Sequence, residues 1–312
     1  MQGIELARRY YETFGAPMIH RAFPEQEGRI AAGIAGTGSE CFGFDDALSR
    51  DHDYQAGFCL WLLPEDEEQI GFRLMRAYEK LPKEFEGVHL SAQSYYGSHK
   101  FGVHTIPDFL QSMIGMPHLP ETWQEWFYLP AYAIANAVNG EIFRDDSGTW
   151  TAMRETLRSG MPEDVRKKKI AAHLALAAQS GQYNYGRCLA HGEQGAAALA
   201  LAEYVNHMLQ LLFLLNRCPC PYYKWSFRAL TKLPVLSDLG PDLSALLIAG
   251  SDLTPEMKKD MIETACGRVV QELKRQELSR IEDRYLETQA FAVMETIGNR
   301  ELRALHVMEY GG

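Results

Sequence analysis

The sequence lacks an apolar run long enough to cross a membrane, and it lacks the apolar core of a targeting segment. Its most apolar stretch, residues 196–215, is interrupted by polar side chains such as Glu203 and His207, whereas a spanning helix needs roughly 20 predominantly apolar residues in a row. The first residues carry charge from Glu5 onward and fit an amphipathic helix. We therefore expect a buried helix near residues 196–215 and no membrane as a partner.

Cysteines are few, and acidic residues outnumber basic ones. Six cysteines are scattered over 312 residues, and a chain of this length needs no disulfide framework, so we expect reduced thiols and a cytoplasmic protein. The Cys218-Pro219-Cys220 pair has no second pair to complete a zinc site. The net charge of −10 opposes nucleic acid as the main partner. A local basic pocket for a triphosphate is compatible with this charge, because nearby groups set the field there.

Four common catalytic motifs are absent from the sequence. It contains no G-x-S-x-G, no Walker A motif, no H-E-x-x-H and no G-x-G-x-x-G. Their absence excludes the hydrolases, P-loop proteins, zinc proteases and dinucleotide-binding enzymes that these motifs mark. The rest is ordinary globular composition, with 46% hydrophobic and 23% charged residues. A chain of this length predicts two domains or one large one.

The chain changes character near residue 150. Before it, short apolar runs alternate with helical patterns, and after it almost every segment has a helical pattern punctuated by Gly and Pro. We predict the α+β class, with a mixed sheet and flanking helices in a first domain at 1–148 and an all-helical bundle at 149–312. The expected strands are 29–35, 51–63, 88–93, 101–106 and 140–144. The expected helices are 65–81, 107–114, 131–138, 149–158, 163–180, 193–216, 222–232, 240–249, 255–278 and 280–297.

A glycine-serine turn and a pair of aspartates follow one another in the first domain. The strand expected at 29–35 ends in a turn containing Gly38 and Ser39. Glycine lets the backbone approach a phosphate closely, and the serine hydroxyl and free N–H groups can bind phosphate oxygens. Asp51 and Asp53 stand at i and i+2 of the next strand, so they share one face. Two carboxylates on one face suit Mg²⁺ or Mn²⁺ bound to a nucleoside triphosphate.

The order and spacing of these residues resemble the G-S…D-x-D motif of the nucleotidyltransferase (polymerase-beta-like) superfamily. The longer segments GTGSECFGFDDALSRDHDY, QYNYGR and LLNRCPCPYYKWSFRAL are similar to an uncharacterised bacterial family. That family is known mainly as a domain of unknown function and is placed near the aminoglycoside nucleotidyltransferases. The resemblance extends over almost the whole chain. It implies a mixed sheet carrying the two aspartates, and a helical bundle that closes the substrate cleft.

The third carboxylate that the superfamily generally uses is not evident. It completes the metal site or acts as general base for the acceptor hydroxyl. The strand expected at 101–106 carries no acid. His104 stands at the corresponding position, where it acts as a base near neutral pH or is simply a half-buried strand histidine. Glu141 is the next candidate, with an exposed glutamate at a strand edge as the alternative. Asp45 and Asp46 lie between the two halves of the motif and are expected to cap or close the turn.

Three features of the second domain are candidates for nucleotide binding. The basic run 166–169 predicts a solvated helix face, or alternatively a lysine that reaches a triphosphate. Tyr183 and Arg187 lie in a segment rich in aromatic and amide side chains, which suits either stacking on a base or a polar contact between helices. Lys224, beside Trp225, is a further candidate, although helical packing explains part of that pattern.

These features together predict a nucleotidyltransferase. We expect Mg²⁺-dependent transfer of a nucleoside monophosphate, AMP from ATP, to a hydroxyl of a small molecule or protein. The partners would be the nucleoside triphosphate and that acceptor, and the protein would be a monomer or homodimer. The alternative is a catalytically degenerate, nucleotide-binding regulatory or antitoxin-like module, because the third acid is not identified.

Overall fold

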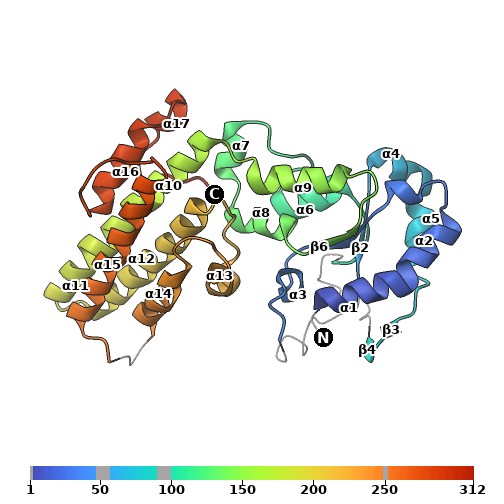
Figure 1. The fold of residues 1–312 in the computed structure, drawn as a ribbon, viewed down its shortest axis with the longest axis horizontal. Coiled ribbons are helices and arrows are strands. Elements are labelled where there is room, and N and C mark those ends of the chain that lie inside the picture. The colour runs from blue at the N-terminus through green and yellow to red at the C-terminus, as the bar shows by residue number, and fades with distance from the viewer. Residues whose placement is uncertain (1–2, 47–56, 90–99, 249–251) are drawn as a thin grey trace. The chain divides into compact units, whose positions relative to one another are not determined.

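The computed structural model describes residues 3–46, 57–89, 100–248 and 252–312. It divides into two units (Figure 1). The sheet unit comprises Met1–Pro120 and Ala133–Gly160, and the helical unit comprises Glu121–Tyr132 and Met161–Gly312. The predicted α+β fold followed by a helical region is confirmed. The unit boundaries differ from the expected division at residue 148, because 149–160 lies in the sheet unit and 121–132 in the helical unit.

A four-stranded mixed sheet organises the sheet unit. Its order is β5-β2-β1-β6; β1 pairs antiparallel with β2 and β6, and β2 pairs parallel with β5. A separate two-stranded hairpin pairs β3 with β4. The strands are β1 (Ala31–Ile34), β2 (Cys59–Leu62), β3 (Glu84–Phe85), β4 (Val88–His89), β5 (Gly102–Thr105) and β6 (Glu141–Arg144). Each expected strand is therefore confirmed with shorter bounds, because Arg29 belongs to η2 and Ile106 begins α6. Residues 51–56 and 90–93 lie outside the described residues.

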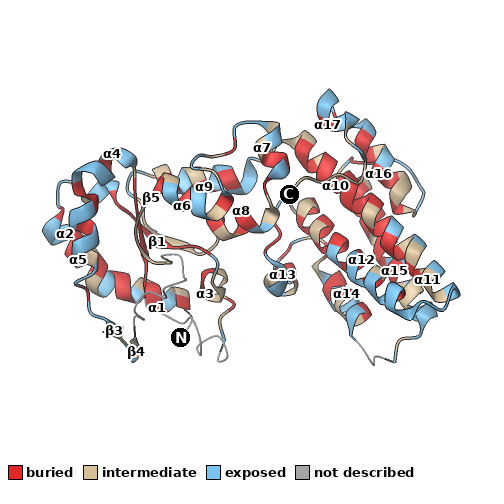
Figure 2. Ribbon diagram, turned by 180° about the vertical axis from the view of Figure 1, so that it is seen from behind, coloured by how far each residue is buried: buried red, intermediate tan, exposed pale blue. Residues whose placement is uncertain are grey.

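Helices cover both faces of this sheet. The helical segments of the unit are α1 (Gly3–Tyr10), η1 (Tyr11–Gly15), α2 (Ala16–Ala22), η2 (Glu27–Arg29), α3 (Ser39–Phe42), α4 (Pro64–Asp66), η4 (Glu67–Gly71), α5 (Phe72–Tyr78), α6 (Ile106–Ile114), α8 (Ala131–Val138) and α9 (Thr149–Ser159). Side chains alternate along a strand, so Leu60 and Leu62 join the core beneath α1, α2 and α5. Trp61 points the other way and packs on Phe109 of α6 and Trp150 of α9. Figures 1 and 2 accordingly place α2 and α5 on one side of the strands and α6 and α9 on the other.

The helical unit is built around two neighbouring helices. They are α10 (Glu163–Ala177), which is largely buried, and α12 (Gln194–Leu215), half of whose residues are buried (Figure 2). The other segments are α7 (Trp123–Tyr128), η5 (Ala178–Tyr185), α11 (Gly186–Ala190), α13 (Tyr223–Leu230), η6 (Ser237–Leu239), α14 (Gly240–Leu247), α15 (Pro255–Arg275), α16 (Leu286–Glu295) and α17 (Arg300–Ala304). Among the described helices, α12 alone is long and apolar enough to span a membrane, and 56% of its apolar window is buried inside the protein.

Two expected helices differ from those observed. The helix expected at 163–180 continues through η5 and α11 to Ala190, because Gly181 leaves room for the ring of Tyr204 and so permits close packing instead of ending the helix. The helix expected from residue 280 begins only at Leu286. The Gln289 amide donates to the Ile281 and Asp283 carbonyls, which holds the preceding segment in a non-helical path.

The helices α3, α7 and α17 are absent from the expected set, and α7 has a signal in the sequence. Residues 123–128 form α7, which begins with a capping box: the Thr122 hydroxyl accepts from the Glu125 N–H, and the Glu125 carboxylate accepts from the Thr122 N–H. The T-x-x-E pattern of such a box is visible in the sequence. It was therefore the signal that could have identified this helix.

Candidate functional site

The glycine-serine turn connects β1 to the short helix α3. Gly36 has a φ of +134°, a conformation that side chains rarely adopt. A side chain at Gly38 would overlap with the carboxylate of Glu40. Thr37 is exposed, and Gly38 and Ser39 are half-buried. The turn therefore combines a backbone that requires glycine with a surface that a ligand can reach, as the predicted phosphate site needs.

The buried carboxylate of Glu40 lies directly behind this turn. Glu40 is 5% exposed, and its carboxylate forms an ion pair with the ammonium of Lys100. The same ammonium lies 5.4 Å from the centre of the Phe101 ring. A buried carboxylate without a cation would repel an anionic ligand at the turn, so Lys100 makes the surroundings of the turn compatible with phosphate. Lys100 has no signature in the sequence, because only the tertiary fold brings it to Glu40.

The predicted metal ligands Asp51 and Asp53 lie outside the described residues. Within residues 3–46, 57–89, 100–248 and 252–312, no group of three His, Cys, Asp or Glu side chains is placed to hold a metal ion. The assignment of Mg²⁺ to the two aspartates stays a prediction. Asp45, which precedes them, has a defined role: its carboxylate accepts a hydrogen bond of 2.8 Å from the N–H of Gly3 at the start of α1.

The two candidates for the general base lie at opposite edges and on opposite faces of the sheet. His104 is on β5, paired in register with Trp61, and its ring centre is 6.1 Å from that of Phe109. Glu141 is on β6, paired with Ile34, which packs with Ala7 of α1. Paired residues share a face, and Trp61 and Ile34 are on different faces, so these two side chains cannot serve one site as alternatives.

Glu141 is held by an ion pair. Its carboxylate contacts the guanidinium of Arg8 on α1, and this contact raises the pKa of Arg8. His104 is half-buried, as expected for the alternative in which it is an ordinary strand histidine and not a base. The geometry therefore gives Glu141 a structural partner in Arg8.

The predicted nucleotide contacts in the helical unit lie far from one another. The Arg187 guanidinium lies 5.1 Å from the centre of the exposed Tyr183 ring, near the start of α12. Lys224, whose ammonium lies 5.0 Å from the centre of a Trp225 ring, follows the end of α12. The neighbouring Gly181 packs on Tyr204, and the helix from there to Leu215 rises about 16 Å at 1.5 Å per residue. Tyr183 and Arg187 therefore do not share one nucleotide site with Lys224.

The basic run 166–169 is not a solvated face, so this prediction is wrong. Arg166, Lys168 and Lys169 are 3%, 0% and 5% exposed. The Lys168 ammonium donates to the carbonyls of His306, Val307 and Glu309, and the Lys169 ammonium donates to the carbonyl of Gly312 at 3.3 Å. Burial lowers the pKa of both lysines to about 8. The two lysines thus hold residues 306–312, which we call the 306–312 segment, against α10.

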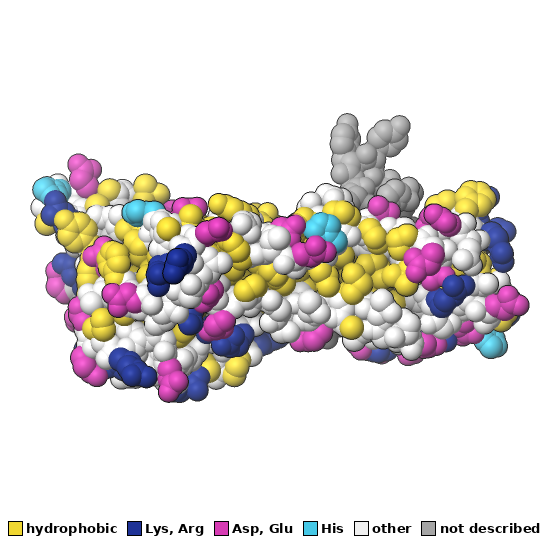
Figure 3. Space-filling view, turned by 90° about the horizontal axis from the view of Figure 1, so that it is seen from above, with side chains coloured by type: hydrophobic (Ala, Val, Ile, Leu, Met, Phe, Trp, Pro, Cys, Tyr) yellow, Lys and Arg dark blue, Asp and Glu magenta, His cyan; other side chains and the backbone are white. Residues whose placement is uncertain are grey.

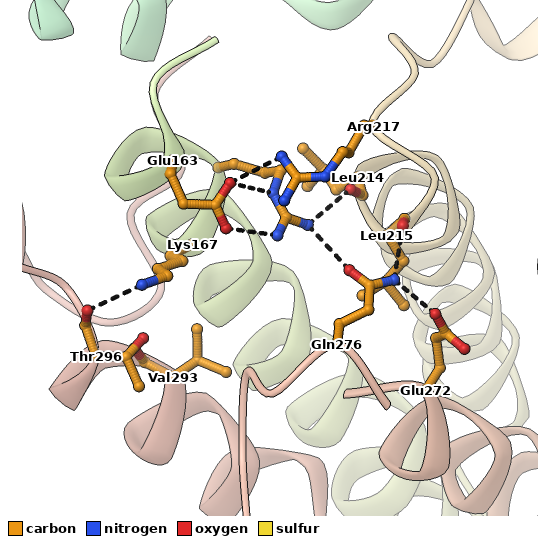
Figure 4. A network of polar contacts seen from close by, with 10 residues as sticks. Glu163, Lys167, Leu214, Leu215, Arg217, Glu272, Gln276, Val293 and Thr296 are labelled. Carbon is orange, nitrogen blue, oxygen red and sulfur yellow. Dashed lines mark hydrogen bonds and ion pairs between the residues drawn. The ribbon is translucent and has the colours of Figure 1, made fainter. Parts of the chain in front are cut away.

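The other two members of the run are also engaged. Figure 4 shows the carboxylate of Glu163 accepting from Arg217, and Lys167 donating to the carbonyl of Thr296. Arg166 binds the same Glu163 carboxylate and the carbonyl of Leu214. Every cation of the run therefore has a partner inside the helical unit. The alternative interpretation, in which one of these lysines reaches a triphosphate, receives no support from these contacts.

A pocket of about 180 Å³ lies elsewhere in the sheet unit. Its lining includes Arg29, Trp61, Asp66, Asp145, Ser147 and Trp150. Ala31 and Trp61, which pair at the start of β1 and the end of β2, mark the end of the sheet opposite the glycine-serine turn. The buried Asp66 carboxylate in its wall is paired with Arg29 at 2.6 Å. The pocket is therefore separate from the predicted phosphate site.

The surface charges and the cysteine side chains can be compared with what the composition predicts. On the face drawn in Figure 3, acidic and basic side chains are interspersed, and the described residues there form no continuous basic patch. All six cysteines are free thiols. Burial raises the pKa of Cys59 and of Cys266 to about 12, so both remain protonated at neutral pH and are unsuited to act as nucleophiles.

Comparison with known proteins shows that part of the chain is similar to a described family. Residues 126–226 match the family described as a domain of unknown function (DUF4037). These residues contain the segment QYNYGR and most of LLNRCPCPYYKWSFRAL, so the expected resemblance to a family of unknown function is confirmed there. The match covers about a third of the chain and does not include the glycine-serine turn. No curated protein matches the sequence.

The chain is also similar to a solved structure. It is the crystal structure of a nucleotidyltransferase-like protein from Exiguobacterium sibiricum 255-15, with 12% sequence identity and a TM-score of 0.33. The similarity covers 92% of this chain and 89% of that chain.

Proposed function

We propose that this protein is a nucleotidyltransferase. It would bind a nucleoside triphosphate at the Gly38-Ser39 turn and transfer the nucleoside monophosphate, AMP from ATP, to a hydroxyl of a small molecule or protein. The observation that carries the proposal is a buried strand, β1, that leads through a glycine-dependent turn to the half-buried Ser39. In the sequence this turn is followed by Asp51 and Asp53.

The residues of the turn have defined tasks in this proposal. The Ser39 hydroxyl and the backbone N–H groups beside it would bind phosphate oxygens. The Lys100–Glu40 ion pair would keep the site free of an uncompensated negative charge. Asp51 and Asp53 would hold Mg²⁺ or Mn²⁺, which when bound neutralises charge on the phosphoryl group. The provisional base for the acceptor hydroxyl would be His104 or Glu141; Glu141 pairs with Ile34 at the end of the sheet that carries the turn, whereas His104 pairs with Trp61 at the opposite end.

Titration calorimetry with Mg–ATP tests binding. We expect wild type to bind and Asp51→Asn and Asp53→Asn to lose binding, because each removes a carboxylate from the metal. Asp108→Asn is the matched control: Asp108 is an exposed aspartate in the first turn of α6 of the same unit. Failure of wild type to bind Mg–ATP or Mn–ATP would overturn the proposal.

Transfer needs a separate experiment. Wild type is incubated with α-labelled ATP, a divalent metal and cell extracts that supply acceptors. We expect label on an acceptor with wild type and none with Asp51→Asn. Binding without transfer across several extracts would favour the second candidate function, a degenerate nucleotide-binding regulatory or antitoxin-like module. The ion pair that occupies Glu141 favours that candidate, because it removes one of the two possible bases.

A further inference from the structure

A single asparagine side chain clamps the backbone at the start of the glycine-serine turn. The N–H of Gly36 donates to Oδ1 of Asn139 at 2.9 Å, and Nδ2 of Asn139 donates to the carbonyl of Gly36 at 2.6 Å. The amide thus satisfies both backbone groups of one residue, as a neighbouring strand would. Asn139 follows α8 and lies 103 positions away in the sequence, so this contact belongs to the tertiary fold.

The backbone beside Asn139 is pressed against the end of β1. Gly140 has a φ of +68°, and a side chain there would overlap with the carbonyl of Ile34. A side chain at Gly33 would overlap with the carbonyl of Glu141. Glycine at both positions allows the two backbones to approach closely. The close approach fixes where Asn139 stands relative to the turn.

Two arginines of α9 hold the other side of Asn139. The buried Arg154 donates to the carbonyls of Ala137 and Asn139, and Arg158 donates to the carbonyl of Val138 at 2.7 Å. These three successive carbonyls form the end of α8, where helical carbonyls lack partners and cations are favourable. Burial lowers the pKa of Arg154 to about 10, so it remains charged at neutral pH. The main chain of Asn139 is therefore fixed independently of its amide.

We propose that Asn139 is a positioning residue for nucleotide binding. It fixes Gly36 so that the N–H groups from Thr37 to Ser39 are held ready for phosphate oxygens. A turn with two glycines has many accessible conformations, and ordering it when the ligand binds would cost affinity. The clamp supplies this order before the nucleotide arrives. The inference rests on the proposed function, because it assigns to Asn139 a task in the same phosphate site.

The chain contains a matched control for this clamp. In the helical unit, Nδ2 of Asn216 donates to the carbonyl of Val235 at 2.9 Å, and the N–H of Val235 donates to Oδ1 of Asn216 at 3.0 Å. Both asparagines are half-buried, and both clamp one residue through the same pair of bonds. Asn216→Ala therefore removes the same pair of bonds, and in addition a bond of 2.8 Å from Nδ2 to the carbonyl of Leu212, away from the glycine-serine turn.

The experiment compares Mg–ATP affinity by calorimetry in wild type, Asn139→Ala and Asn216→Ala, with melting temperature as the measure of stability. We expect Asn139→Ala to weaken binding about tenfold, as the loss of two hydrogen bonds suggests, and Asn216→Ala to change it less than about twofold. Equal Kd values for the two variants would overturn the inference and leave the proposed function intact. Absence of binding by wild type would instead overturn the proposed function and, with it, this inference.

A second variant tests the inference even if Asn139→Ala fails to fold. In Asn139→Asp the ionised carboxylate accepts from the Gly36 N–H but has no proton for the Gly36 carbonyl, whereas the protonated carboxyl group can make both bonds. Because an aspartate titrates near pH 3.9, we expect the ratio of its Kd to that of wild type to fall about threefold between pH 7.5 and pH 4.5. Circular dichroism confirms folding at both pH values. A ratio independent of pH would overturn the inference, because a purely structural loss would not depend on protonation of this side chain.

Discussion

The sheet unit and the helical unit each hold an irregular segment in place, and they use different chemistry to do so. In the sheet unit a neutral amide, Asn139, clamps Gly36, and glycines allow the backbones to approach. In the helical unit two buried ammonium groups, Lys168 and Lys169, bind carbonyls of the 306–312 segment. The contacts of the Asn139 side chain involve no charged group, whereas the contacts of Lys168 and Lys169 bury two ammonium groups.

This difference has consequences for stability. A neutral amide does not titrate, so its contribution is independent of pH over the ordinary range. A buried lysine has a lowered pKa, and removing its side chain leaves carbonyls without a donor. Gly311 and Gly312 pack against the carbonyls of Phe127 and Tyr128, where a side chain would overlap. The 306–312 segment therefore combines close backbone packing with charge. We expect the loss of one of its lysines to lower the free energy of unfolding more than the loss of the Asn139 amide does.

The largest expected effect comes from removing a buried lysine. Lys168→Ala leaves three carbonyls of the 306–312 segment without their donor, and we expect the free energy of unfolding to fall by about 3 kcal/mol. Urea denaturation measures the loss, and hydrogen exchange at residues 306–312 should rise. The control is Lys167→Ala, because the half-buried Lys167 donates to the Thr296 carbonyl; its expected cost is below about 1 kcal/mol. Equal losses for the two variants would contradict the assignment.

A pH titration distinguishes the charged device from the neutral one. Burial lowers the pKa of Lys169 in the folded chain to about 8, whereas a lysine in the unfolded chain titrates near 10.4. Between these values the unfolded chain binds more protons than the folded one, so stability rises with pH. The free energy of unfolding of wild type relative to Lys169→Met should therefore rise by about 2 kcal/mol from pH 8 to pH 10.

The comparison with Lys169→Met cancels the titration of tyrosines and cysteines, which both chains share. The same measurement on wild type and Asn139→Ala should give a difference that does not change with pH, because neither side chain titrates. If the difference in free energy of unfolding between wild type and Lys169→Met did not change with pH, the Lys169 ammonium of wild type would be hydrated in the folded chain. If the difference between wild type and Asn139→Ala changed with pH, the assignment of a neutral clamp to Asn139 would be contradicted.

A smaller effect is expected at the glycine-serine turn itself. Lys100→Met leaves the buried Glu40 carboxylate uncompensated beside the turn, and we expect it to weaken Mg–ATP binding about fivefold, or about 1 kcal/mol. Arg29→Met is the matched control, because Arg29 pairs with the buried Asp66 at the opposite end of the same sheet. The control should lose comparable stability and keep wild-type affinity. Equal affinities for the two variants would remove Lys100 from the site.

Local pattern sufficed to predict most of the secondary structure and the turn. The buried strand β1 and the glycines after it follow from an apolar run and from residues that permit unusual backbone angles. The basic run was misjudged for a physical reason. The partners of Lys168 are backbone carbonyls of the 306–312 segment, about 140 positions away, and a carbonyl has no signature in sequence. A run of cations therefore looks solvated until the fold supplies acceptors.

The relation between His104 and Glu141 was also beyond the sequence. Their separation depends on strand order and on the irregularity between Ala32 and Gly33, which shifts the register of β6 against β1. A shift of one residue exchanges the faces of a strand, so the side on which Glu141 lies was not determined by local pattern. The predicted phosphate turn is local and could be derived, whereas the base must be assigned from tertiary pairing.

The smallest expected effect concerns the ion pair between Arg8 and Glu141. Their side chains are 31% and 40% exposed, and exposed pairs contribute less than about 1 kcal/mol because solvent screens them. A double-mutant cycle of Arg8→Met and Glu141→Gln, measured by urea denaturation, should give a coupling of about 0.5 kcal/mol that shrinks in 1 M salt. A coupling above about 2 kcal/mol would mean that the pair is desolvated like the lysines of the helical unit. Buried charge would then stabilise the sheet unit as well, and it would no longer distinguish the helical unit from the sheet unit.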